Sequence, residues 1–348
     1  MTTAMGMAVV GAGYWGPNLV RNAMATPSLH LRWLCDLDED RARRVLGPYS
    51  TVRTTSSYDA VLSDPDVHAV AIATPAATHF PLAMAALDAG KHVLVEKPLT
   101  SALADAEKLV QAAADRGLVL MCDHTYCYTP AVQELQRLVH SGEVGDVQFV
   151  DSVRINLGLV QPDVNVLWDL APHDISILDY LLPPGVSVVE VAALGSDPIG
   201  HGLACVAYLT LRLSTGAMAH VHVNWLSPVK IRTMVIGGSH RTVVWDDLNP
   251  SQRLCVYDRG VERTAFEDLG ADDRRQVRIS YRTGDMVAPA LSEHEALRSM
   301  VAEFVAAVTE GRSPATDGSA GLRVMRILEA AERSFRLDGA FVDVGGVE

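Results

Sequence analysis

The sequence has few basic residues, no pair of cysteines at metal-ligand spacing and no long apolar run. Lys and Arg number 29 against 42 Asp and Glu, which gives a formal net charge of -13. Because nucleic acids attract clustered Lys and Arg, this balance argues against a nucleic-acid partner. No apolar stretch is long enough for a transmembrane helix, so we expect no membrane partner either.

The cysteines are scattered and odd in number, and none forms a C-x-x-C motif; they are Cys35, Cys122, Cys127, Cys205 and Cys255. Such a set is typical of buried thiols in a reducing compartment, and not of a disulfide framework or a zinc site. The first residues lack the basic and then apolar pattern of a signal peptide. We therefore expect a cytoplasmic protein without a metal site, and its 348 residues suggest two domains.

A glycine-rich turn lies close to the start of the chain. The apolar run Met7–Val10 leads into Gly11-Ala12-Gly13-Tyr14-Trp15-Gly16, which has G-x-G-x-x-G spacing, and an amphipathic segment follows. The first glycine permits the tight turn, the second lets a pyrophosphate approach the backbone, and the third lets the helix lie close to the strand. The N–H groups at such a helix start attract phosphate oxygens. This context predicts a dinucleotide site; the alternative is a glycine turn in an ordinary βα unit.

An acidic residue follows the next predicted strand. Asp36 comes directly after Leu31–Cys35, and no basic residue follows it before Arg41. A carboxylate at this place accepts both ribose hydroxyls of NAD and repels the 2′-phosphate of NADP. We therefore expect NAD, with NADP less favoured. The residues expected to bind it here are Gly11, Gly13, Tyr14, Trp15, Gly16 and Asp36.

The first third of the chain alternates predicted strands and helices. Short apolar runs without alternation indicate strands that are covered on both faces, as in a parallel sheet. Alternating units of this kind predict a doubly wound Rossmann fold. The predicted strands are Met7–Val10, Leu31–Cys35, Ala69–Ala73, His92–Val95 and Val119–Cys122. The predicted helices are Trp15–Ala25, Glu39–Leu46, Tyr58–Leu62, Pro81–Ala89, Ala102–Arg116 and Ala131–Ser141.

The pattern changes after about Gly145. A long strand and a helix precede a series of strands joined by short turns, which indicates a large, open, mainly antiparallel sheet. These elements are Val147–Asn156, the helix Ala171–Leu182, and strands Val186–Ala193, Leu203–Leu213, Met218–Trp225, Ile231–Ile236 and Thr242–Asp246. Two helices, Glu293–Val308 and Leu322–Arg336, end the chain, and Phe266–Ser292 is assigned only as loop. The expected fold class is α/β, with residues 1–123 as an NAD-binding Rossmann domain and 124–348 as an α/β domain for substrate binding and oligomerisation.

Two short polar segments close neighbouring strands. Thr74-Pro75, with His79 shortly after, follows one strand, and Glu96-Lys97 closes the next. Because ligands of open parallel sheets bind at the carboxyl ends of the strands, we expect all five residues beside the nicotinamide. A proline after Lys97 biases its backbone towards a sharp turn that would hold the amine in the cleft. The alternative for Lys97 is an ordinary surface lysine.

A carboxylate and an imidazole occur one helical turn apart. Asp169 and His173 are four residues apart, so a helix would place them on one face. A histidine titrates near neutrality and can take a hydroxyl proton as a hydride leaves, while the carboxylate orients it. Pro172 fits a first helical turn and therefore predicts that the helix begins near Asp169. We expect Asp174 and Asp179 to be solvated helix residues or caps.

Taken together, these segments resemble the glucose–fructose oxidoreductase / inositol dehydrogenase / MocA family over nearly the whole chain. The resemblance rests on the glycine motif 11–16, Thr74-Pro75 with His79, Glu96-Lys97-Pro98 and Asp169-x-x-x-His173. It implies an NAD-dependent oxidoreductase in which Lys97 and His173 act on the reacting carbinol and Asp169 assists. It also implies a homodimer or homotetramer formed through the C-terminal sheet. Which of Lys97 and His173 accepts the proton stays open.

Within the family, the chain most resembles the bacterial nucleotide-sugar branch of UDP-N-acetylglucosamine 3-dehydrogenase-like proteins. The branch features are His124-Thr125-Tyr126, Asn224–Pro228 with Lys230 and Arg232, and Asp246–Leu248. The segment Tyr126–Pro130 departs from the Phe and Asn that usually precede this proline, which leaves the sugar open. We expect six residues to bind substrate, with packing as the alternative for the tyrosines: Lys97, Tyr126, Tyr128, Arg154, Asp169 and His173.

The sequence thus predicts hydride transfer between nicotinamide and a ring hydroxyl or keto carbon of a sugar, nucleotide-linked and with C3 favoured. The alternatives are an inositol or free polyol dehydrogenase and a non-catalytic, NAD(H)-sensing binding protein. His220 and His222 share one strand face by period two. We interpret them as part of a polar sheet face or a subunit contact rather than as a metal pair.

Overall fold

The computed structural model describes residues 4–162, 164–263 and 279–345. The chain divides into two compact units. Unit 1 comprises Met1–Pro130, Ile175–Tyr180 and Glu293–Glu329, and unit 2 comprises Ala131–Asp174, Leu181–Ser292 and Ala330–Glu348. These units interleave along the chain, whereas the predicted domains 1–123 and 124–348 do not, and that division remains a proposal. None of the described helices is long and apolar enough to span a membrane.

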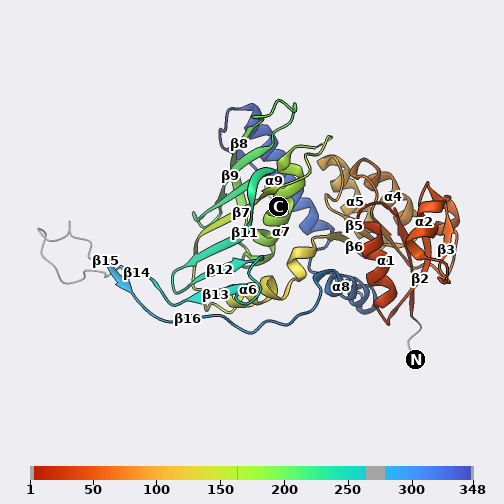
Figure 1. Cartoon of the computed structure of the whole chain (residues 1–348), viewed down its shortest axis with the longest axis horizontal. Coiled ribbons are helices and arrows are strands. Elements are labelled where there is room, and N and C mark those ends of the chain that lie inside the picture. The colour runs from red at the N-terminus through yellow and green to blue at the C-terminus, as the bar shows by residue number, and fades with distance from the viewer. Residues whose placement is uncertain (1–3, 163, 264–278, 346–348) are drawn as a thin grey trace, which may run out of the picture. The chain divides into compact units, whose positions relative to one another are not determined.

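Unit 1 is built on a six-stranded parallel sheet in the order β3-β2-β1-β4-β5-β6 (Figure 1). The strands are β1 (Met5–Val10), β2 (Leu29–Cys35), β3 (Arg53–Thr55), β4 (Ala69–Ile72), β5 (His92–Glu96) and β6 (Leu120–Asp123). The doubly wound fold is confirmed, and the strand order reverses between β1 and β4, where dinucleotides bind in such sheets. The sequence analysis missed β3 because its three residues, Arg-Thr-Thr, lack the apolar run of a buried strand.

Helices follow the strands of this sheet as predicted, and each begins within two residues of its predicted first residue. They are α1 (Gly16–Ala25), α2 (Glu39–Leu46), α3 (Tyr58–Leu62), α4 (His79–Asp88) and α5 (Leu103–Arg116). Helix α8 (Ala296–Glu310) belongs to the same unit, and Met300 and Phe304 are fully buried in its core. This burial explains why a helix so late in the chain is part of the N-terminal fold. All five cysteines are buried and free of disulfides, as predicted.

Unit 2 is built on a nine-stranded sheet in the order β16-β13-β12-β11-β7-β10-β9-β8-β17. The strands are β7 (Val147–Leu157), β8 (Val188–Ser196), β9 (Val206–Leu213), β10 (Met218–Asn224), β11 (Leu226–Gly238), β12 (Thr242–Asp246), β13 (Leu254–Tyr257), β16 (Met286–Val287) and β17 (Val342–Asp343). Every neighbouring pair is antiparallel except β7 and β10, which run parallel. The prediction of a mainly antiparallel sheet is therefore confirmed.

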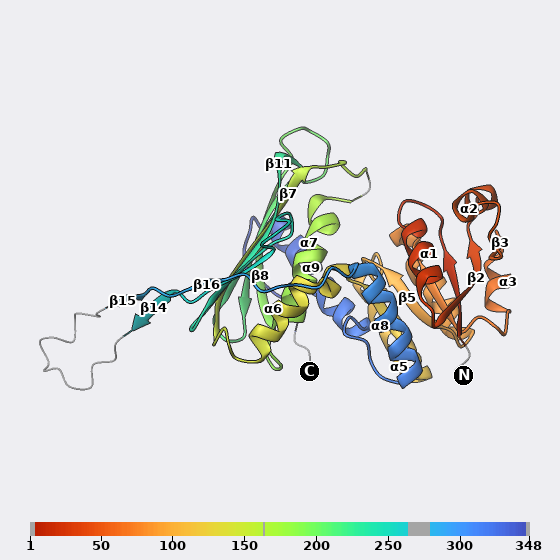
Figure 2. The same ribbon diagram turned by 60° about the horizontal axis from the view of Figure 1, so that its bottom comes forward.

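Helices α6 (Pro130–His140) and α7 (Val166–Leu181) lie along one face of the sheet in both ribbon views (Figures 1 and 2). The opposite face presents half-exposed side chains such as Phe149, Tyr208 and Met218. Helix α9 (Gly318–Arg336) ends in this unit, where Ser334 donates to and accepts from the backbone of Ala193. The predicted homodimer or homotetramer formed through the open face stays a prediction.

The assignment of Phe266–Ser292 as loop was incomplete. β14 (Gly260–Arg263) pairs with β15 (Ile279–Arg282) in a separate two-stranded sheet, and β16 lies a few residues further on. Residues 266–278 of that segment lie outside the described residues. The two strands were missed because each is only four residues long and carries charged or polar side chains.

Candidate active site

The glycine turn of unit 1 has the geometry that its three glycines predict. Gly11 adopts a φ of +99°, which L side chains rarely reach. A Cβ at Gly16 would lie 2.0 Å from the carbonyl oxygen of Gly11, so the third glycine allows the close helix contact. A Cβ at Gly13 would meet nothing within 4 Å, so this stretch of backbone borders open space. The turn therefore fits a pyrophosphate at the start of α1.

Asp36 lies at the end of β2 and is bonded to the same turn. One carboxylate oxygen accepts from the Ala12 N–H at 2.6 Å, and the other accepts from the Asp38 N–H at 2.8 Å. Arg41 Nη1 lies 3.9 Å from the second oxygen. Each oxygen has a further lone pair, so the carboxylate can still accept ribose hydroxyls. The chain's own residues thus fit NAD.

The aromatic residues of the turn differ in their surroundings. Trp15 donates its indole N–H to Asp123 Oδ2 at 3.1 Å, which ties the glycine turn to the end of β6. Tyr14 is 95% exposed and makes no such tie. Both were predicted to bind the cofactor; the Trp15 contact shows a positioning role in the turn, and cofactor contact stays a prediction for both.

His79 is buried below the segments that close β4 and β5. Its ring nitrogens lie 2.8 Å from the carbonyl oxygens of Thr74 and Pro98. Since carbonyls only accept, the ring makes both bonds at once only when it carries both protons. Burial lowers the pKa of His79, and the two carbonyls oppose that shift. His79 therefore lies between the two segments, and when neutral it donates to one of the two carbonyls. Contact of His79 with the cofactor stays a prediction.

Titratable groups gather at the carboxyl ends of β5 and β6. Glu96 and Asp123 are register partners on these strands, and Lys97 and His124 follow them directly. Burial raises the pKa of Glu96 well above its usual range, Asp123 raises it further, and Lys97 opposes the shift. Burial also raises the pKa of Asp123 and lowers that of His124 to about 3. At neutral pH His124 is therefore an uncharged ring beside a lysine.

Asp123 and His124 were not among the predicted site residues. Asp123 accepts from Trp15 and from the Thr125 hydroxyl, and His124 is only 2% exposed. Ligands bind at the carboxyl ends of parallel strands, which is why Glu96 and Lys97 were predicted. The same argument applies to the end of β6, so the sequence could have indicated Asp123 and His124.

Tyr128 is buried with its hydroxyl 2.9 Å from Thr316 Oγ1, while Tyr126 is half-buried. Substrate contact by the two tyrosines stays a prediction.

In unit 2, helix α7 begins at Val166 and not near Asp169, so the predicted start was wrong. Asn165 caps it: its side-chain oxygen accepts from the Trp168 N–H at 3.2 Å. Asp169 falls in the first turn, and Pro172 lies inside the helix. Asp169 and His173 are on one face of α7, as their spacing predicts. The meeting of this face with Lys97 would join residues of different units and stays a prediction.

Side chains of Trp225, Arg154 and Ser152 connect α7 with the sheet of unit 2. Trp225 donates its indole N–H to Asp169 Oδ2 at 3.0 Å. Arg154 on β7 and Asp174 are each about 2% exposed and form an ion pair with an N–O distance of 2.6 Å, and Ser152 donates to Asp174. The expectation of a solvated Asp174 was therefore wrong, because a strand residue twenty positions earlier neutralises it. Substrate contact by Arg154 stays a prediction beside this buried pairing.

Other candidate side chains have structural partners. Asp179 receives two bonds from Arg323 at 2.7 and 2.8 Å, so it is not merely solvated. The rings of Tyr208 and His222 stack on the sheet with centroids 4.4 Å apart. Arg232 Nη1 lies 3.3 Å from Asp247 Oδ2. Across the described ranges, no group of three or more His, Cys, Asp or Glu has the geometry to hold a metal ion.

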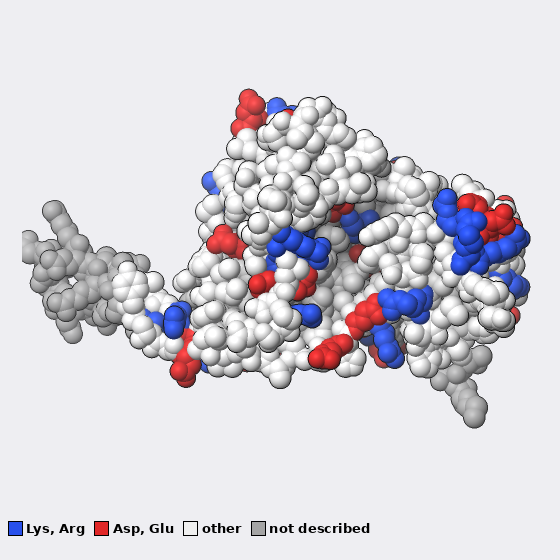
Figure 3. All heavy atoms as spheres, in the orientation of Figure 1, with Lys and Arg blue, Asp and Glu red and all other residues white. Residues whose placement is uncertain are grey.

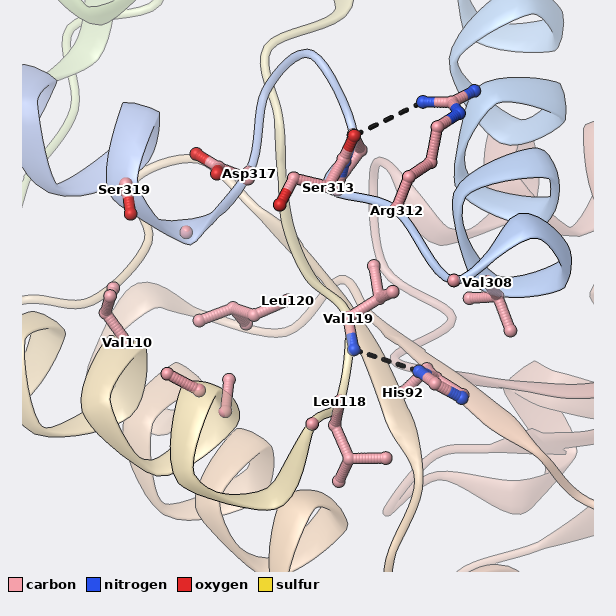
Figure 4. A pocket seen from close by; sticks show the side chains of 16 residues that line it. His92, Val110, Leu118, Val119, Leu120, Val308, Arg312, Ser313, Asp317 and Ser319 are labelled. Atoms are coloured by element: carbon pink, nitrogen blue, oxygen red, sulfur yellow. Dashed lines mark hydrogen bonds between the residues drawn. The ribbon is translucent and has the colours of Figure 1, made fainter.

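A cleft of about 420 Å³ lies in unit 1 (Figure 4). His92, Val119 and Leu120 place it at the amino ends of β5 and β6, where the Val119 N–H donates to His92 at 2.9 Å. The cleft therefore lies at the edge of the sheet opposite the one that Lys97 follows.

On the face drawn in Figure 3, basic and acidic side chains gather together over α2, where Arg43 pairs with Glu39 and Asp40.

Comparisons with known proteins agree with this architecture. A model described as an oxidoreductase family with an NAD-binding Rossmann fold matches residues 5–124, and the GFO/IDH/MocA C-terminal domain matches residues 132–244. UDP-N-acetylglucosamine 3-dehydrogenase of Acidithiobacillus ferrooxidans is 30% identical over 91% of this chain and 93% of that protein. Its solved structure, GnnA, has a TM-score of 0.79 at 27% identity over 96% of this chain and 100% of that one.

The chain is also similar to a protein of gentamicin A biosynthesis and to a dTDP-sugar reductase. GenD2 from gentamicin A biosynthesis, solved in complex with NAD, has a TM-score of 0.81 at 26% identity and covers 99% of this chain and 98% of that one. The dTDP-3,4-didehydro-2,6-dideoxy-alpha-D-glucose 3-reductase of Streptomyces violaceoruber is 46% identical over 36% of this chain and 39% of that protein. The chain therefore belongs to the GFO/IDH/MocA family of NAD-dependent oxidoreductases.

Proposed function

We propose that the protein transfers a hydride between NAD and a ring hydroxyl or keto carbon of a nucleotide-linked sugar, with C3 as the favoured position. The observation that carries the sugar assignment is the 30% identical relative that spans 91% of the chain and acts on UDP-N-acetylglucosamine at C3. The dTDP-sugar 3-reductase supports the same substrate class. The residues that we assign to the reaction are Lys97, whose amine follows the end of β5, and Asp169 with His173 on one face of α7.

Bound NAD would supply the hydride acceptor for oxidation of the carbinol. The glycine turn and Asp36 would hold the dinucleotide at the reversal of the sheet order. His173 takes the hydroxyl proton as the carbonyl forms, and Asp169 orients the imidazole. Lys97, when cationic, stabilises the negative charge that develops on the oxygen. In the reverse direction the same groups return the proton to the oxygen.

The first test removes the two proposed catalytic side chains separately. We expect Lys97→Ala and His173→Ala each to lower kcat by ~10²–10⁴-fold, because general acid–base help has that magnitude. NAD affinity, measured by calorimetry, should stay nearly unchanged. Lys108→Ala is the matched control, since Lys108 is an exposed lysine paired with Asp105 on α5. Equal losses of NAD binding and turnover would make the two side chains structural and contradict the mechanism.

The second test addresses the substrate. We expect NADH formation with UDP- or dTDP-linked hexoses, or NADH consumption with their 3-keto forms, and a much lower kcat/KM with free inositols. A preference for inositols would replace the proposal by its polyol alternative. Measured NAD binding without turnover on any sugar of either class would favour an NAD(H)-sensing protein.

A further inference from the structure

Trp225 lies between β10, which ends at Asn224, and β11, which begins at Leu226. Its backbone is bonded on both sides: the Trp225 N–H donates to the Cys205 carbonyl at 3.0 Å, and its carbonyl accepts from the Gly158 N–H at 2.9 Å. Its side chain is 1% exposed. The indole is therefore fixed to the sheet of unit 2 rather than to the helix that it contacts.

Gly158 leaves room for two side chains, one of which is this indole. A Cβ at that position would lie 2.8 Å from Asn156 Nδ2 and 3.2 Å from Trp225 Cδ1, closer than ordinary packing. The absence of a side chain after β7 thus lets the ring lie against the backbone of the turn.

The indole N–H points at the first turn of α7, where it donates to Asp169 Oδ2 at 3.0 Å. An indole nitrogen only donates, so its partner here is an oxygen lone pair of the carboxylate. Asp169 is half-buried, and side chains on a helix adopt one of a few staggered rotamers. A donor fixed to the sheet selects one of them and so determines how the carboxylate faces His173, one turn further along α7.

We propose that Trp225 is the positioning residue of the Asp–His face: its indole N–H holds the Asp169 carboxylate in one orientation on the face of α7 that carries His173. This inference rests on the proposed function for the role of Asp169. It gives a role to the segment Asn224–Pro228, which contains Trp225 and which the proposed mechanism does not otherwise use. It also predicts that Trp225 affects catalysis only through Asp169.

The kinetic test compares Trp225→Phe, Asp169→Asn and the double variant. We expect Trp225→Phe to lower kcat ~10-fold with KM within two-fold, because the carboxylate loses the donor that orients it. The double variant should match Asp169→Asn within two-fold. Losses in kcat that multiply in the double variant, or a KM that changes as much as kcat, would overturn the proposal. Full activity of Asp169→Asn would instead overturn the role of Asp169 in the proposed function.

A second measurement does not depend on turnover. In protein labelled with ¹⁵N-tryptophan, the Trp225 indole signal is identified by its loss in Trp225→Phe. We expect its chemical shift to change in Asp169→Asn, because this substitution replaces the group that accepts from the indole. An indole signal that is insensitive to this substitution would overturn the proposal. Trp245→Phe, which removes an equally buried indole from β12, controls for lost packing and should leave kcat within two-fold of wild type.

Discussion

At the scale of single residues, the carboxylate that we expect to favour NAD over NADP already has backbone partners. Asp36 accepts from Ala12 and Asp38, so its charge is held where the ribose is expected. The nearest guanidinium belongs to Arg41, with Nη1 3.9 Å from Asp36 Oδ1. A basic group so close becomes a partner for a 2′-phosphate once the carboxylate is removed.

We therefore expect Asp36→Ser to lower kcat/KM for NAD at least ~10-fold and to raise kcat/KM for NADP, because repulsion of the 2′-phosphate is lost while Arg41 remains. Steady-state kinetics with both cofactors at a saturating second substrate measures the ratio. Asp40→Ser, at an exposed position of α2, is the control and should leave the ratio unchanged. An unchanged preference for NAD would assign the discrimination to other residues.

The residues that sequence alone could identify are those whose role is local. The spacing of Gly11, Gly13 and Gly16 predicts the dinucleotide turn, and the position of Asp36 along the chain after them predicts its place at the ribose. Trp225 and Asp169 are 56 positions apart, and nothing in the sequence around either predicts that they meet. The same holds for contacts such as Trp15 with Asp123, which only the order of strands brings together.

At the scale of elements, α7 is joined to β7 by a buried ion pair. Arg154 and Asp174 are each about 2% exposed, and Ser152 adds a hydrogen bond to the carboxylate. The attraction between two buried charges offsets the free-energy cost of removing them from water, and this offset is lost when either charge is removed. This pair, together with the Asn165 cap, sets where α7 begins and how it lies on the sheet. The apolar pattern instead predicted a start near Ala171, because it registers neither a cap nor a partner strand.

We expect Asp174→Ala to lower the free energy of unfolding by ~3–5 kcal/mol, since it leaves a buried guanidinium without its carboxylate. The double variant Arg154→Met/Asp174→Leu should lose much less, because two apolar side chains of similar volume need no neutralisation. Urea unfolding followed by circular dichroism measures both. A loss below about 1 kcal/mol for the single variant would show that the pair contributes little to stability.

At the scale of the whole molecule, the sequence determined the two sheets more clearly than the division of the chain between them. Alternating strands and helices predicted the Rossmann fold, and short turns predicted the antiparallel sheet. The placement of α8 in unit 1 follows from a buried stripe that includes Met300 and Phe304. Periodicity shows that such a stripe is buried, but not which sheet or helix buries it.

The stability of the molecule should depend on pH through His124. Burial lowers the native pKa of His124 to about 3, below the 6.5 of an exposed histidine. Above pH 6.5 neither the native nor the unfolded state protonates this ring, so its contribution is fully present. As pH falls from 6.5 towards 3, the unfolded state binds a proton that the native state excludes. The free energy of unfolding then falls by ~1.4 kcal/mol per pH unit on account of this group.

Glu96 and Asp123 act in the opposite sense, because burial raises their pKa values and the native state therefore binds protons before the unfolded state does as pH falls. The wild-type profile is therefore a sum of opposing slopes, and the difference between variants isolates the histidine. We expect His124→Asn to lose less stability than wild type between pH 7 and 5, by ~2 kcal/mol in urea unfolding. His30→Asn, at an exposed position of β2, should follow the wild-type profile. Parallel profiles for His124→Asn and wild type would mean that this ring is protonated alike in the folded and unfolded chain.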